Sequence, residues 1–90
     1  MPYNGWKNYE TWAIGVWIDN HEDSQAAFAS MGQLIDKRVR LADAIRDTVV
    51  AGVPDIGVNM YSDLLEVALE QVDWFELADH FRDQEQEGVN

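Results

Sequence analysis

The sequence predicts an all-α protein, a small single-domain bundle of about four helices. Apolar residues recur at steps of three and four positions over most of the chain, and no alternating strand pattern is longer than a few residues. Residues that favour turns lie between the periodic segments rather than within them. A chain of 90 residues has room for one hydrophobic core, so we expect residues 1–90 to form a single domain.

The first element is predicted as a lead-in over residues 1–7, followed by a helix over residues 8–20. Asn8 has the side chain of an N-cap residue, and Glu10 in the first turn suits the helix dipole. One stripe of this helix carries more apolar area than any other segment, so we predict that it is the central helix. Its stripe residues are Tyr9, Trp12, Ala13, Val16 and Trp17. The predicted structural core comprises Trp12, Trp17 and Trp74.

Residues 25–51 keep a helical pattern throughout, with a break near residues 32–37 as one alternative. Gly32 favours a bend there, whereas the regular stripe favours one long helix, and the sequence leaves both open. The stripe residues are Phe28, Met31, Ile35, Val39, Ala42, Ile45 and Val49. Residues 52–59 contain two glycines and a proline and are predicted to be a loop, whose apolar side chains we expect to pack on the bundle.

The last third of the chain predicts two more helices. The first has its apolar stripe at Tyr61, Leu64, Leu65, Ala68, Leu69 and Val72. Asp73 and Glu76 have the spacing of a capping box and predict a new helix from Asp73. Its buried stripe is predicted to be Trp74, Leu77, Ala78 and Phe81. Residues 82–90 are predicted to be a polar tail.

The composition is strongly acidic. Six Lys and Arg stand against 17 Asp and Glu, which gives a net charge of −11. This balance argues against direct binding to nucleic acid or to an anionic membrane, and favours a basic protein as the partner. The chain has no cysteine, no basic and apolar leader typical of a signal peptide, and no apolar run long enough to span a bilayer. We therefore expect a cytoplasmic protein.

Catalytic and metal-binding patterns are weak. Asp19, His21 and Asp23 alternate like the start of a calcium loop, but no glycine follows at the sixth position and Ser30 stands where a bidentate glutamate belongs. His80 follows Glu76 by four residues, a spacing that is common on helix surfaces. No serine has an evident base partner. We predict no catalytic residue, no metal site, no cofactor and no enzymatic activity.

Acidic residues of the last two helices recur every three or four positions. One interpretation is a solvated outer face. The other is a partner-binding acidic face, whose carboxylates are about one helical turn apart and approach the spacing of phosphates along a strand. The predicted members of this face are Asp63, Glu66, Glu70, Asp73, Glu76, Asp79 and Asp83. The basic residues Lys37, Arg38 and Arg40 are expected to pair with acidic helices within the chain.

Two stretches, NGWKNYETWAIGVWIDN (residues 4–20) and YSDLLEVALEQVDWFELADHF (residues 61–81), carry a resemblance. They resemble a family of small, largely uncharacterised proteins of phages, plasmids and prokaryotic genomes that open with an NGWxNYETW motif. The chain departs from the family pattern at Ala13-Ile14-Gly15, where bulkier aliphatic residues are usual. The matching positions are Trp6, Asn8, Tyr9, Glu10, Thr11, Trp12, Trp17, Asn20, Leu64, Leu65, Ala68, Leu69, Trp74, Glu76, Ala78 and His80.

The resemblance implies the context of a mobile element rather than a mechanism. Our first hypothesis is an accessory protein that binds a basic host protein in the cytoplasm of the host cell. Its sharpest form is a nucleic-acid mimic that inhibits a host defence complex, by an anti-CRISPR or anti-restriction action. The second hypothesis is a small structural or homodimeric domain whose acidity serves solubility or salt adaptation.

Overall fold

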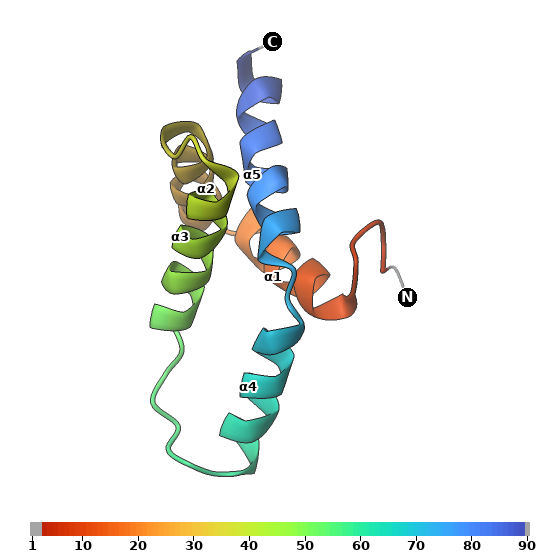
Figure 1. Ribbon diagram of the computed structural model, residues 1–90, viewed down its shortest axis with the longest axis vertical. Coiled ribbons are helices and arrows are strands. Elements are labelled where there is room, and N and C mark those ends of the chain that lie inside the picture. The colour runs from red at the N-terminus through yellow and green to blue at the C-terminus, as the bar shows by residue number, and fades with distance from the viewer. Residues whose placement is uncertain (1–2, 90) are drawn as a thin grey trace.

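The computed structural model describes the backbone of residues 3–89 and the side chains of residues 3–83. The predicted all-α class is confirmed, and residues 3–89 contain five helices in place of about four (Figure 1). They are α1 (Tyr9–Asp19), α2 (Glu22–Leu34), α3 (Arg38–Ala51), α4 (Met60–Gln71) and α5 (Trp74–Val89). None of the helices described is long and apolar enough to cross a membrane.

The additional helix comes from a break between α2 and α3. Of the two alternatives for residues 25–51, the structure has the pair of helices, since α2 ends at Leu34 and α3 begins at Arg38. Gly32 lies before this break and has a different role. A Cβ atom there would lie 2.7 Å from the carbonyl oxygen of Phe81. Because Gly32 has no side chain, the backbone of α2 can approach the backbone of α5 closely at this point.

The central helix is α5, not α1 as predicted. Its residues Leu77, Ala78 and Phe81 are fully or almost fully buried. They meet the buried side chains of α3, and Phe28 of α2 stacks at a tilt on the ring of Phe81, with 5.4 Å between centroids. Figure 1 shows α2 and α3 beside α5, with α1 crossing at the lower end of α5. Buried residues contributed by the other elements are Ile18, Leu41, Ala42, Ile45 and Val72.

The prediction of which face of α1 is buried was wrong. The helix buries Thr11, Gly15 and Ile18, which lie about half a turn away from the predicted aromatic stripe at 3.6 residues per turn. Trp17, predicted to be core, is 68% exposed and stacks on the ring of His21. Trp12 is half-buried and contacts an outer aromatic cluster instead of the core.

The physical reason is that small residues face the core from α1. A Cβ atom on Gly15 would lie 3.0 Å from the ring of Trp6, so the absence of a side chain makes space for this indole. Thr11 has no exposed surface and uses its hydroxyl group to bond with the start of α5. Gly15, one of the positions at which the chain departs from the family pattern, therefore allows Trp6 to pack against α1.

Helix α4 is set apart from the bundle. It has close contacts only with α1 among the described helices, and it buries none of its own residues. Tyr61 and Leu64, predicted for its buried stripe, are 66% and 63% exposed. The loop before it packs on the bundle only in part, because Val53 is half-buried but Ile56 is 39% exposed and Val58 is fully exposed. The chain thus presents an apolar helix whose neighbours cover only part of it.

Candidate protein-binding surface

The N-terminal segment is anchored on the junction between α4 and α5. Asn8 caps α1 as predicted: its Oδ1 atom accepts hydrogen bonds from the backbone N–H and the hydroxyl group of Thr11. The amide nitrogen of Asn8 donates to the carbonyl oxygen of Gln71, at 2.6 Å. The hydroxyl oxygen of Thr11 accepts from the backbone N–H of Asp73, at 2.9 Å. These bonds fix the place where α5 begins.

Two of the predicted acidic-face residues serve this junction. Asp73 caps α5, since its Oδ1 atom accepts from the backbone N–H groups of Phe75 and Glu76. Glu76 does not complete the predicted capping box. Its carboxylate accepts from the backbone N–H of Lys7, at 2.9 Å, because Thr11 already bonds the N–H of Asp73. Both carboxylates are partly buried. Glu76 holds the backbone of the N-terminal segment to α5, and the second carboxylate oxygen of Asp73 lies 3.8 Å from Nζ of Lys7.

A third acidic residue, Asp79, has a basic partner. Its two carboxylate oxygens accept from Nε and Nη2 of Arg38, at 2.9 and 3.0 Å. This bond raises the pKa of the Arg38 guanidinium above its ordinary value, and the same group lies 4.7 Å from the centre of the Phe75 ring. The expected pairing of the basic residues is thus confirmed for Arg38. The described side chains include no ion pair of Lys37 or Arg40.

The remaining four acidic residues are exposed. Asp83 lies on α5. Asp63, Glu66 and Glu70 form a strip on α4, and their carboxylates have no hydrogen bond or ion pair with other described residues. At 1.5 Å per residue, the three are about 4.5 and 6 Å apart along the helix axis. α4 contains no Lys or Arg. We call Asp63, Glu66 and Glu70 the α4 acidic strip.

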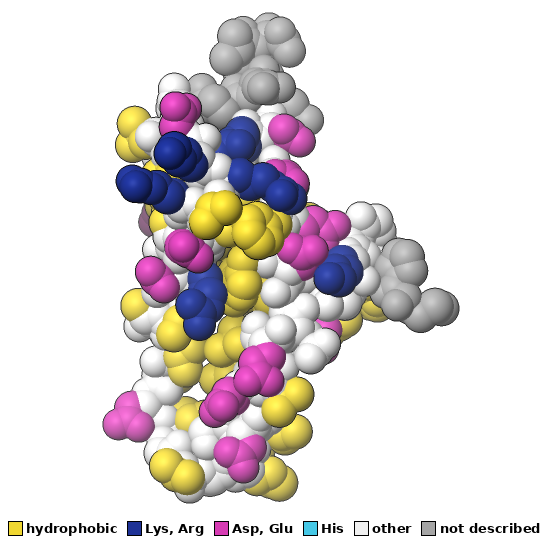
Figure 2. All heavy atoms as spheres, viewed as in Figure 1, with side chains coloured by type: hydrophobic (Ala, Val, Ile, Leu, Met, Phe, Trp, Pro, Cys, Tyr) yellow, Lys and Arg dark blue, Asp and Glu magenta, His cyan; other side chains and the backbone are white. Residues whose placement is uncertain are grey.

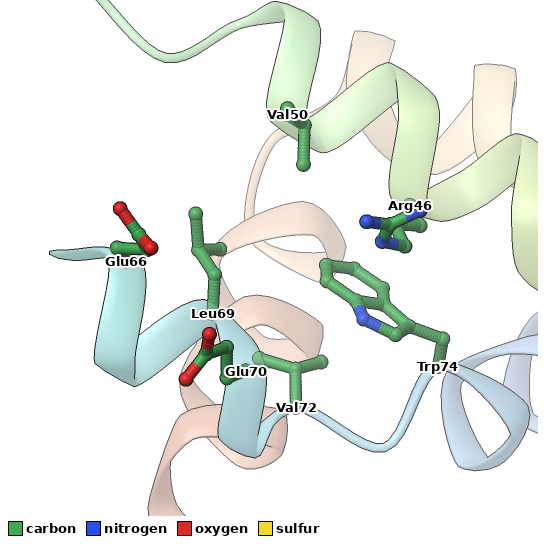
Figure 3. Close-up of a pocket in the computed structure, with 7 residues that line it drawn as sticks. All are labelled: Arg46, Val50, Glu66, Leu69, Glu70, Val72 and Trp74. Carbon is green, nitrogen blue, oxygen red and sulfur yellow. The ribbon is translucent and has the colours of Figure 1, made fainter.

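A groove runs beside this strip. Figure 2 shows acidic side chains over α4, at the lower edge of a hollow with an apolar floor. One part of the groove has a volume of about 460 Å³ and is lined by α3, α4 and the start of α5. In Figure 3, Glu66 and Glu70 lie on the α4 side, Arg46 and Val50 on the α3 side, and Trp74 between them. The groove therefore joins an apolar surface to two carboxylates.

The two histidines occupy different places. The Nδ1 atom of His21 donates to the carbonyl oxygen of Trp17, at 2.6 Å, and the Nε2 atom of His80 lies 2.8 Å from a carboxylate oxygen of Asp19. The ring of Trp6 lies 4.9 Å from that of His80. No three His, Asp or Glu side chains in the described part of the chain are grouped as metal ligands would be.

The sequence did not predict the groove, nor that Arg46, Val50 and Trp74 would line it. A signal was present in α4, where Met60, Leu64 and Val67 form an apolar face in addition to the one that contains Leu65 and Leu69. A helix covered by one neighbour needs an apolar stripe of about 100°. The apolar arc of α4 is much wider, which indicates surfaces for more than one partner.

Comparison of the chain with protein-family models, curated proteins and solved structures gives no match. The resemblance drawn from the two motifs therefore stays a prediction. The surface of α4 has to be interpreted from its own chemistry.

Proposed function

We propose that this protein is a non-catalytic accessory protein that binds a basic surface of a host protein. The observation that carries the proposal is the α4 acidic strip. Its carboxylates are exposed, have no bond to any other described side chain, and lie on a helix without a basic residue. With a net charge of −11, the chain attracts basic surfaces over long distances and repels acidic ones.

The sharper form of the proposal is mimicry of nucleic acid, with a nucleic-acid-binding defence complex of the host as the partner. The working surface is smaller than the seven-residue face predicted from the sequence. Asp73, Glu76 and Asp79 have partners within the chain, which leaves the α4 acidic strip and Asp83 for contact with another protein. In this form, DNA or RNA competes with the protein for the same partner site.

The experiment is affinity capture from a host lysate at increasing salt, with the parent and a variant that carries Asp63→Lys, Glu66→Lys and Glu70→Lys. We expect the parent to lose its partner as salt rises, and the variant to capture none, because exposed charge pairs are screened. A matched control reverses Asp23, Asp36 and Asp47, which are exposed on α2, the following turn and α3. Equal capture by all three proteins at every salt concentration would refute the proposal.

A second candidate is a homodimeric domain whose acidity serves solubility. The exposed apolar residues Met60, Tyr61, Leu64 and Val67 of α4 favour it. Sedimentation equilibrium distinguishes the two functions. A dimer that Leu64→Glu dissociates supports the second candidate, and a monomer at all concentrations removes it.

A further inference from the structure

The groove beside the α4 acidic strip is longer than the part drawn in Figure 3. A second hollow of about 380 Å³ extends it toward the loop and shares Val50, Glu66 and Leu69 with the first. The apolar lining of the two hollows comes from α3, the loop after it, α4 and the start of α5. The apolar lining residues are Val50, Val53, Pro54, Ile56, Leu65, Leu69, Val72 and Trp74.

The groove is built into the fold. α4 contacts α1 and has no close backbone approach to α3, so the two helices are separated along their length. One end is held by the bonds of Asn8 and Thr11 to the α4–α5 junction. At the other end, Asp55 accepts from the backbone N–H of Gly57, and Asn59 caps α4. The bonds of Asn8 and Thr11 therefore hold the α4–α5 end of the groove to the bundle, and the loop bonds order the start of α4 locally.

The charges at the edges select the occupant. Glu66 and Glu70 line the α4 wall, Asp55 lies at the loop end, and Arg46 is the only basic side chain that lines either hollow within the described residues. Resting on the proposed function, we propose that this groove binds a basic amphipathic helix of the partner protein. Large apolar side chains of that helix fill the hollows, and its Lys or Arg side chains pair with Glu66 and Glu70.

The dimensions fit such a helix. The lining residues of α4 run from Ser62 to Glu70, a length of about 12 Å at 1.5 Å per residue, and Trp74 lies beyond the end of α4. Anchor side chains at positions i, i+4 and i+7 of a helix span roughly 10 Å. Glu66 and Glu70 are four residues apart, so basic residues four apart on the incoming helix can reach both.

A second copy of the chain is a poorer occupant. Among the exposed apolar residues that it could insert, Met60, Leu64 and Val67 of its own α4 lie next to its own acidic strip, and the whole copy carries a net charge of −11. Insertion would bring those carboxylates toward Glu66 and Glu70, and like charges close together oppose association. Charge thus favours a basic partner over self-association.

The test uses two synthetic helical peptides of the same composition. In the first, leucines at i, i+4 and i+7 are flanked by lysines. In the second, the same residues are rearranged so that no apolar face forms. Titration of ¹⁵N-labelled protein, followed by NMR, reports on the parent without any substitution. We expect the first peptide to shift the indole N–H signal of Trp74 and the amide signals of Val50 and Leu69, and the second to leave them in place.

Variants then separate the groove from charge alone. Val50 is exposed at the groove and Val39 is exposed elsewhere on α3, so Val50→Trp fills the groove and Val39→Trp is its matched control. We expect Val50→Trp and the double variant Glu66→Lys with Glu70→Lys each to weaken binding of the first peptide at least tenfold. Val39→Trp and Asp23→Lys should stay within threefold of the parent, since neither residue lines the groove or belongs to the α4 acidic strip.

Three results would overturn the inference, each in a different way. If both peptides bind equally and Val50→Trp has no effect, contact is by charge alone, and the proposed function stands without the groove. If Val50→Trp abolishes binding that salt and Glu66→Lys leave unchanged, the occupant is apolar, and the proposed function fails as well. If the protein alone is a dimer that Val50→Trp dissociates, a second copy occupies the groove.

Discussion

Replacing Thr11 with valine tests how the N-terminal segment holds the start of α5. Thr11 has no exposed surface, and valine keeps its shape while removing the hydroxyl group. That group donates to Oδ1 of Asn8, at 2.6 Å, and accepts from the backbone N–H of Asp73, at 2.9 Å. The valine variant leaves the N–H of Asp73 without its acceptor, in a site that the methyl groups keep from water.

The expected cost follows from these two bonds. A buried donor without a partner costs about 1–3 kcal/mol, and the lost bond to Asn8 adds roughly 1 kcal/mol. We therefore expect Thr11→Val to lower the free energy of unfolding by about 2–4 kcal/mol. For a domain of this size, that corresponds to a fall in Tm of roughly 10–30 °C.

The assay is thermal and urea unfolding followed by circular dichroism, with Thr11→Ser as the matched control. Serine keeps the hydroxyl group and removes one methyl group, at a cost of roughly 1 kcal/mol. If valine unfolds within 0.5 kcal/mol of the parent, the hydroxyl group does not hold the junction. If serine is as destabilising as valine, the loss comes from packing, and the hydrogen-bond reasoning is refuted.

Three further substitutions test other parts of the fold by urea denaturation. Gly32→Ala should cost about 1–3 kcal/mol or more, because its Cβ atom would lie 2.7 Å from the carbonyl oxygen of Phe81; an unchanged midpoint would contradict the close approach of α2 and α5. Trp17→Ala should lower the free energy of unfolding by less than about 1 kcal/mol, since the indole is 68% exposed. A loss of about 3 kcal/mol or more would show that Trp17 is a core residue and contradict the structure. Asp73→Ala should cost about 1–2 kcal/mol through two lost capping bonds, whereas Asp73→Asn should retain most of the stability; equal losses would point to charge rather than capping.

The helices were predictable where local chemistry decides them. Asn8 and Asp73 cap α1 and α5 as the sequence indicated, because a cap depends on the side chain and on backbone groups two or three residues away. The break before α3 was an open alternative. No residue in it forbids a helix, and the decision lies in how α2 and α3 pack on α5.

The buried face of α1 could not be predicted from apolar spacing. Thr11 is buried because its hydroxyl group bonds to a residue 62 positions away, and Gly15 because Trp6 lies over it. Neither contact affects the spacing of apolar residues along α1. The aromatic residues on the opposite face of this helix produce the stronger periodic pattern. The same bias made α1, rather than α5, the expected central helix.

The candidate site was predicted in part. The exposure of Asp63, Glu66 and Glu70 follows from their spacing on α4. The different roles of Glu76 and Asp79 depend on Lys7 and Arg38, which come from other parts of the chain. The groove depends on the distance between α3 and α4, a property of the whole fold. Only the unusually wide apolar arc of α4 pointed toward it.

The central claim is that the protein binds a basic partner through α4 and the groove beside it. The most direct test is hydrogen–deuterium exchange on the unmodified protein, alone and with the partner that it captures. We predict that protection on binding is concentrated in Met60–Gln71 of α4 and in the groove-lining half of α3, around Arg46 and Val50. Protection confined to the aromatic surface of α1, around Tyr9 and Trp17, with α4 exchanging at its free rate, would contradict the claim.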